Sequence, residues 1–113
     1  MSTRNSLSLL VVLLCLGIAG CSKPDPNDPA VQAAISEAQN LGLAYLEENQ
    51  LNEAEDAFKQ LISLNPDDPA GYTNLGIVYL RRGDFPLAED NLLAGLERAP
   101  NDPDIPINLA TVY

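Results

Sequence analysis

Residues 35–68 read ISEAQNLGLAYLEENQLNEAEDAFKQLISLNPDD, and residues 69–102 read PAGYTNLGIVYLRRGDFPLAEDNLLAGLERAPND. The two stretches align without a gap, and 10 of their 34 positions are identical, where chance would give about two. A third copy begins at Pro103 and matches again at five of the last 11 residues. This internal repeat is therefore the strongest structural signal in the sequence.

Each unit contains the pattern of two amphipathic helices. Apolar and small residues recur at three- and four-residue steps, stop at 48–50 or 83–84, and resume, which indicates one buried stripe on each helix. Gly42, Gly76, Ala54 and Ala88 are small where the helices of a hairpin must approach closely. We expect aromatic residues, Tyr45 and Phe58 in the first unit, to fill the remaining space.

Helix starts are marked by three Asp-Pro pairs, at 28–29, 68–69 and 102–103. Aspartate caps the free N–H groups of a helix start, and proline is harmless at the first helical position. Pro106 would interrupt a helix that began directly after Asp102. We therefore expect the last helix to begin later, capped by Asp104, with Pro106 in its first turn.

The pattern resembles the tetratricopeptide repeat, a helix–turn–helix unit of 34 residues. The resemblance covers roughly 35–113 and departs mildly at Ala38, Leu92 and Ala110, where the family has other residues. It implies an all-α fold in which helical hairpins stack as a short right-handed solenoid. Residues 35–68 and 69–102 would be complete repeats, and 103–113 the first helix of an incomplete third. The matching positions are Leu41, Gly42, Tyr45, Ala54, Phe58 and Pro66, then Tyr72, Leu75, Gly76, Tyr79, Ala88 and Pro100.

The family binds peptides or protein segments, and the resemblance implies a concave face lined by the first helix of each unit. Asn40, Asn74 and Asn108 recur in register and could bond a peptide backbone or hold adjacent helices together. The face lacks the cations of a carboxylate clamp, because Gln39, Leu43, Thr73 and Ile77 occupy those places. It favours an unidentified hydrophobic helix or strand over an acidic tail. The candidate partner-binding residues are Gln39, Asn40, Leu43, Leu46, Glu47, Thr73, Asn74, Ile77, Leu80, Arg81 and Asn108.

The N-terminus has the parts of a secretory signal peptide, predicted to span 1–20. Arg4 precedes an apolar run of about 12 residues, which is short for a bilayer-spanning helix of roughly 20. The segment from Ile18 to Cys21, Ile-Ala-Gly-Cys, resembles the lipobox of bacterial lipoproteins. The resemblance implies cleavage before Cys21, with a diacylglycerol on its sulfur and an acyl chain such as palmitate on its nitrogen. An uncleaved membrane anchor is the alternative.

Residues 21–34 would then hold the lipidated cysteine, a proline-rich tether and the start of the first helix. Ser22, rather than aspartate, follows the cysteine, and in Gram-negative lipoproteins this resemblance favours the outer membrane, facing the periplasm. The acyl chains would be the only membrane attachment, because a chain of net charge −10 does not adhere to anionic lipid heads. The same acidity argues against nucleic acid as a partner.

We expect no enzymatic activity, no cofactor and no metal site. The chain has no histidine and no glycine-rich phosphate loop, and Cys15 would leave with the signal peptide. Asp25, Asn27 and Asp28 resemble the start of a calcium loop but lack its glycine and distal glutamate. Acidic runs on amphipathic helices are usually the solvated face.

The sequence stops at Tyr113, in the middle of a repeat, without the polar closing helix of a solenoid. We expect Leu109, Val112 and Tyr113 to be exposed, in a fragment of a longer protein or in a chain completed by a partner or a second copy. The predicted function is a membrane-anchored, non-catalytic scaffold for protein–protein interaction in the bacterial envelope. The alternative is the N-terminal docking part of a longer, possibly enzymatic, lipoprotein.

Overall fold

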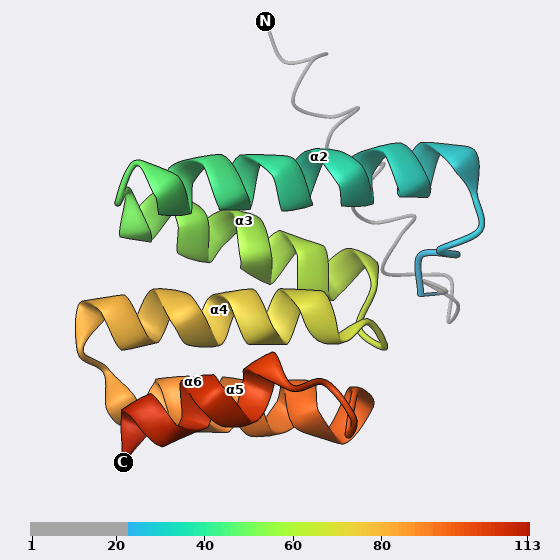
Figure 1. Ribbon diagram of the computed structural model, residues 1–113. Helices are drawn as coiled ribbons and strands as arrows, with labels where there is room; N and C mark the ends of the chain where they lie inside the picture. Colours follow the sequence, from blue (N-terminus) through green and yellow to red (C-terminus); the bar gives the residue numbers. More distant parts are fainter. Residues whose placement is uncertain (1–22) are drawn as a thin grey trace, which may run out of the picture.

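The computed structural model describes residues 23–113, which form five helices and no strand. Figure 1 shows them as a stack of antiparallel rods, with the first helix at one end and the last two at the other. The all-α class and the stacked hairpins agree with the sequence prediction. The helices are α2 (Pro29–Glu47), α3 (Leu51–Leu64), α4 (Pro69–Arg82), α5 (Phe85–Arg98) and α6 (Asp104–Val112).

Neighbouring helices in the chain are neighbours in space. α2 packs on α3 and α4 packs on α5 to make two hairpins, α3 contacts α4 to join them, and α6 lies on α5. The first helices of successive units also touch, because α4 contacts both α2 and α6. This arrangement places α2, α4 and α6 along one side of the stack.

Aspartates begin the first helix of each unit. The carboxylates of Asp28 and Asp68 accept hydrogen bonds from the backbone N–H groups two residues later, at 2.9 and 2.7 Å. Asp102 does the same for the N–H of Asp104 at 2.9 Å. The expected cap at Asp104 is therefore wrong: Asp104 is the first residue of α6 and Asp102 supplies the carboxylate, while Pro106 lies in the first turn as predicted.

The turns inside the two hairpins are closed by equivalent residues. Asn49 has φ 58° and Gly83, 34 positions later, has φ 80°. Left-handed backbone at a helix end favours glycine and tolerates asparagine. Asp84 then caps α5 through the N–H of Leu87.

Small residues let the helices of each hairpin approach, as the repeat predicts. A methyl group added at Gly42 would overlap with the ring of Phe58, and one added at Gly76 would lie 2.7 Å from Cγ of Leu92. Ala54 and Ala88 are fully buried. The core therefore repeats a pairing of glycine on the first helix with a large side chain on the second.

The last helix is better packed than the sequence suggests. Leu109 is buried with Leu92 and Ile105, and Val112 is partly buried against the same cluster. The expectation that both would be exposed is wrong, because α6 turns them toward α5 and α4. Tyr113 is exposed, as predicted.

The predicted signal peptide, 1–20, and Cys21 lie outside the described residues. Residues 23–28 contain no helix, in keeping with their prolines. No helix of the described part of the chain has the length and apolarity needed to cross a membrane.

Candidate functional site

The predicted binding residues all belong to α2, α4 and α6, and the side of the stack that these helices form is here called the first-helix face. Their common origin is the repeat, which places equivalent positions of each unit at the same height along neighbouring helices. They are Gln39, Asn40, Leu43, Leu46 and Glu47 on α2, Thr73, Asn74, Ile77, Leu80 and Arg81 on α4, and Asn108 on α6.

Several of these side chains are available to another molecule. Leu43 is an exposed large apolar residue on α2, and Asn40 and Glu47 beside it are also exposed. Ile77 and Leu80 on α4 are partly buried against the core. The face thus combines accessible apolar side chains with polar neighbours.

Two of the predicted residues face the interior instead. Leu46 is only 6% exposed and belongs to the main core. The hydroxyl of Thr73 is buried at the α4–α5 contact, where a methyl group added at Gly95 would lie 2.6 Å from it. These two side chains pack beneath the first-helix face and contribute little surface that a ligand could contact.

The recurring asparagines differ in their surroundings. Asn40 is exposed and Asn74 is partly buried, and neither side chain makes a hydrogen bond among the described residues. Asn108 donates from Nδ2 to the backbone carbonyl of Asp104, 3.0 Å away on its own helix. The amides of Asn40 and Asn74 are therefore free to bond with a ligand.

Sequence reasoning missed one prominent residue on this face. Ile107 on α6 is 65% exposed, and it aligns with Gln39 and Thr73 in the first two units. Extending the same alignment into the third unit would have found it. At this position Thr73 is turned toward α5, whereas Ile107 on α6, like Leu43 on α2, is an exposed apolar side chain.

Arg81 connects the first two units. Its Nη1 donates a hydrogen bond to the backbone carbonyl of Leu46 at 2.6 Å. Carbonyls in the last turn of a helix lack partners within the helix, and a cation is favourable there. The exposed guanidinium of Arg81 thus holds α4 against the end of α2.

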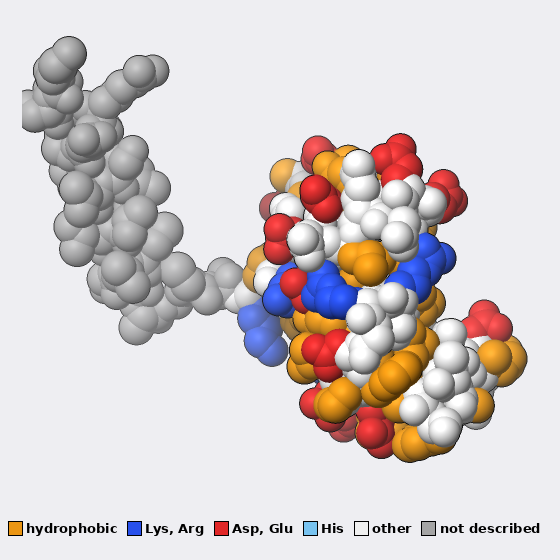
Figure 2. Space-filling model, turned by 90° about the vertical axis from the view of Figure 1, so that its left-hand side faces the viewer, with side chains coloured by type: hydrophobic (Ala, Val, Ile, Leu, Met, Phe, Trp, Pro, Cys, Tyr) orange, Lys and Arg blue, Asp and Glu red, His pale blue; other side chains and the backbone are white. Residues whose placement is uncertain are grey.

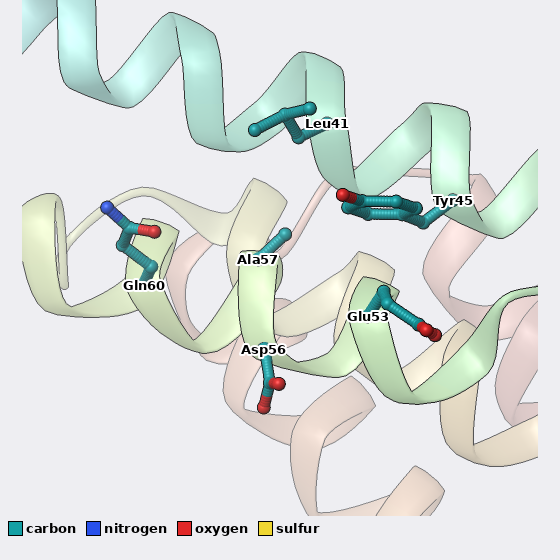
Figure 3. Close-up of a pocket in the computed structure, with 6 residues that line it drawn as sticks. All are labelled: Leu41, Tyr45, Glu53, Asp56, Ala57 and Gln60. Atoms are coloured by element: carbon teal, nitrogen blue, oxygen red, sulfur yellow. The ribbon is translucent and has the colours of Figure 1, made fainter.

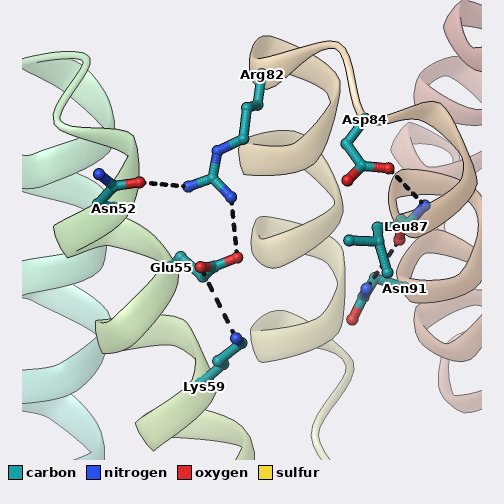
Figure 4. A network of polar contacts seen from close by, with 7 residues as sticks. All are labelled: Asn52, Glu55, Lys59, Arg82, Asp84, Leu87 and Asn91. Carbon is teal, nitrogen blue, oxygen red and sulfur yellow. Dashed lines mark hydrogen bonds and ion pairs between the residues drawn. The ribbon is translucent and has the colours of Figure 1, made fainter.

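A second joint lies between α3 and α4, drawn in Figure 4. Arg82 bonds the carboxylate of Glu55 at 3.1 Å and the side-chain oxygen of Asn52 at 2.9 Å. Lys59 lies 3.8 Å from the same carboxylate. The hydroxyl of Tyr79 also bonds Glu55, and this bond, followed by Arg82, holds the pKa of Glu55 below its ordinary value.

The pKa of Tyr79 changes in the opposite direction. Burial first, and then the bond to the negative carboxylate of Glu55, raise it from 10.0 to about 12. The same pairing recurs one unit later, where the hydroxyl of Tyr113 lies 2.6 Å from the carboxylate of Glu89. A tyrosine of α4 and a tyrosine of α6 therefore each meet a glutamate of the preceding helix.

Charges are unevenly spread over the molecule. Figure 2 looks at the end of the stack where α2 and α4 finish, and shows basic side chains gathered across its middle with acidic ones above and below. Arg81 and Arg82 close α4 at this end. Among residues 23–113 no group of histidines, cysteines or carboxylates is arranged to hold a metal ion.

A hollow of about 250 Å³ lies between α2 and α3, away from the first-helix face. In Figure 3, Leu41 and Tyr45 lie on α2, opposite Ala57 and Gln60 of α3, with the carboxylates of Glu53 and Asp56 at the rim. The site is shallow and acidic.

Comparison with known proteins gives one family and two informative structures. A family model described as tetratricopeptide repeat matches residues 40–103. The complex of the TPR2B domain of yeast Sti1 with pHsp70 is similar with a TM-score of 0.69 and 26% identity, over 71% of this chain and 64% of that one.

The complex of the TPR2AB domain of yeast Sti1 with pHSP90 gives a TM-score of 0.71 over 96% of this chain and 38% of that one, and its 23% identity indicates the fold alone. The chain spans less than two thirds of the length of either structure. No curated protein matches the sequence.

Proposed function

Because this chain belongs to the tetratricopeptide repeat family, we propose that its first-helix face binds a segment of another protein. The observation that carries the proposal is the pair of exposed apolar side chains, Leu43 on α2 and Ile107 on α6, on a face that also presents free amides. Apolar anchors flanked by polar groups are the usual composition of a protein-binding surface. The role is that of a scaffold without catalysis.

The similar TPR2B domain of yeast Sti1 occurs in a complex with pHsp70, which supports a protein segment as the class of ligand. The character of the segment follows from this chain's own residues. Leu43 and Ile77 present apolar surface, and the net charge of −10 disfavours an acidic tail. The ligand is therefore an extended or helical segment with apolar side chains.

A photo-crosslinking amino acid placed at Leu43, and separately at Ile107, tests the proposal in cells. Both positions should capture the same protein, because one segment crosses the whole face. Glu97, exposed on the second helix α5, is the matched control and should give no such product. Equal capture at Glu97, or two unrelated products from Leu43 and Ile107, would contradict the proposal.

We also propose that lipid on Cys21 anchors the protein to a bacterial membrane. The lipobox resemblance of 18–21 supports this, and the proline-rich residues 23–28, which form no helix, suit a tether. Cys21→Ser should abolish incorporation of labelled palmitate and release the protein from membranes. Cys15→Ser is the matched control and should leave both unchanged, because that residue would be removed with the signal peptide. Normal labelling of the Cys21→Ser variant would contradict the anchor.

The proposed location is the outer membrane, facing the periplasm, on the basis of Ser22 after the cysteine. Separation of inner and outer membranes from a Gram-negative host tests this directly. The protein should sediment with the outer membrane, and Ser22→Asp should move it to the inner one. Recovery of the unaltered protein in the inner membrane would refute the location without affecting the binding proposal.

A further inference from the structure

Two repeat positions are buried in the second unit but accessible in the first. Leu75 and Tyr79 on α4 are 4% and 5% exposed, because α3 of the preceding unit covers them. Leu41 and Tyr45 occupy the same repeat positions on α2, yet Leu41 is 44% exposed and Tyr45 lines the hollow between α2 and α3. The outer side of the first hairpin, here called the end face, thus has the side chains of an internal interface and no described helix over them.

The internal interfaces show what a covering helix contributes. α3 places Glu55 against the hydroxyl of Tyr79 and against Arg82. The charges balance there, because the acid comes from the covering helix and the cation from the covered one. The Glu55–Arg82 pair at the α3–α4 interface therefore needs no charge from outside.

The end face lacks the cation that the internal interface has, and therefore needs a positive charge from its partner. Glu48 occupies the repeat position of Arg82, so the covered helix supplies an acid where the internal interface has a cation. Glu53 and Asp56 add two carboxylates at the rim of the hollow, and none of the residues that line it is basic. A segment lying on this face must bring its own positive charge, or three carboxylates remain unpaired beside an apolar contact.

We propose that the end face binds an amphipathic helix of another protein, which inserts an apolar side chain between Leu41 and Tyr45 and presents lysine or arginine to Glu48. The hollow of about 250 Å³ has room for one large side chain. A second copy of this chain is disfavoured as the occupant, because each copy carries a net charge of −10. This surface is separate from the first-helix face and does not depend on its proposed role.

The helix that covers the internal interface supplies a probe. A synthetic helix-stapled peptide with the sequence of Leu51–Leu64 is compared with the same peptide carrying Glu55→Lys, and the binding of each to the full chain in detergent is measured by fluorescence anisotropy. Stapling is needed because a helix this short is marginal in water. The lysine peptide should bind about tenfold more tightly, the size expected when one close charge pair replaces a repulsion.

Three variants of the protein decide the origin of the binding. Glu48→Arg should reverse the preference, so that the unmodified peptide binds more tightly. Leu41→Asp, at an exposed position, should abolish binding of both peptides. Leu93→Asp, at an exposed position on α5, is the matched control and should leave binding unchanged. Circular dichroism confirms that each variant keeps its helix content.

The proposal is overturned if the two peptides bind equally, if neither binds, or if Glu48→Arg leaves the preference unchanged. It is also overturned if sedimentation shows a dimer of the full chain that Leu41→Asp dissociates, because a second copy would then occupy the face.

Discussion

Arg81 of the second unit donates a hydrogen bond to the backbone carbonyl of Leu46 in the first, over 2.6 Å. Thirty-five residues separate them, so this contact links two units rather than two turns of one helix. The sequence placed both residues on the ligand side, and the structure gives them a shared structural role. The end of α2 is fixed by a side chain of its neighbour.

Arg81→Ala should lower the free energy of unfolding by about 1 kcal/mol, the usual net contribution of one hydrogen bond, because water competes for the exposed guanidinium. Urea denaturation followed by circular dichroism measures the change. Glu97→Ala, an exposed change on α5, should have no effect on the midpoint. An unchanged midpoint for Arg81→Ala would mean that the bond adds nothing to stability.

Glu55 should make stability depend on pH in the acid range. Its folded-state pKa lies below the ordinary value of 4.5, chiefly because of the bond from Tyr79. A lowered pKa stabilises the fold above pH 4.5, and this contribution is lost as the pH falls through the folded-state value. Glu55→Gln should therefore be less stable than the parent at pH 7, and the difference should shrink toward acid pH. A difference that stays constant from neutral to acid pH would exclude this origin.

Gly76→Ala should destabilise the protein by about 1–3 kcal/mol, the cost of overpacking a filled core. The added methyl would lie 2.7 Å from Cγ of the fully buried Leu92. Thermal unfolding measures the loss, which the better helix propensity of alanine offsets only by about 1 kcal/mol. Gly76→Ala combined with Leu92→Val should recover part of it, and failure to do so would place the strain elsewhere.

Gly83 should accept asparagine better than alanine. Its φ is 80°, and nothing within 4 Å would meet an added Cβ, so the cost of substitution is conformational alone. Asn49 already occupies the equivalent position with φ 58°. Gly83→Ala should cost about 1 kcal/mol, and Gly83→Asn clearly less. Equal losses in chemical denaturation would show that the left-handed turn is not what selects the residue.

Thr73→Val should raise stability by roughly 1 kcal/mol, because a buried hydroxyl without a partner is costly. Among residues 23–113 its Oγ1 has no hydrogen-bond partner, and valine keeps its shape. Thr111→Val is the control and should not raise stability, because the exposed Thr111 hydroxyl already donates to the carbonyl of Ile107 at 3.3 Å. A loss of stability in Thr73→Val would show that the hydroxyl is satisfied in solution.

The repeat made most of the fold predictable. Identity at Gly42 and Gly76 indicated a close helix contact, and the structure places Phe58 and Leu92 against them. The Asp-Pro pairs located the starts of α2 and α4 to the residue. These features could be predicted from the sequence because short-range chemistry and a fixed repeat length determine them.

Contacts between units were harder to predict. Periodicity assigns Leu46 to a face, but only the packed structure shows that its side chain turns into the core. Leu109 was expected to be exposed because no helix follows it, yet α5 already buries it. Both outcomes depend on the angle at which hairpins stack, which no local pattern encodes.

The Glu55–Arg82 pair has a consequence for folding. Units of similar sequence can pack in the wrong order or exchange between chains while the polypeptide is still collapsing. Because Glu48 replaces arginine on α2, that helix would set carboxylate against carboxylate if it docked on α3 in place of α4. The charge difference between residues 48 and 82 thus destabilises arrays in which the repeats stack in the wrong order, and favours stacking in sequence order.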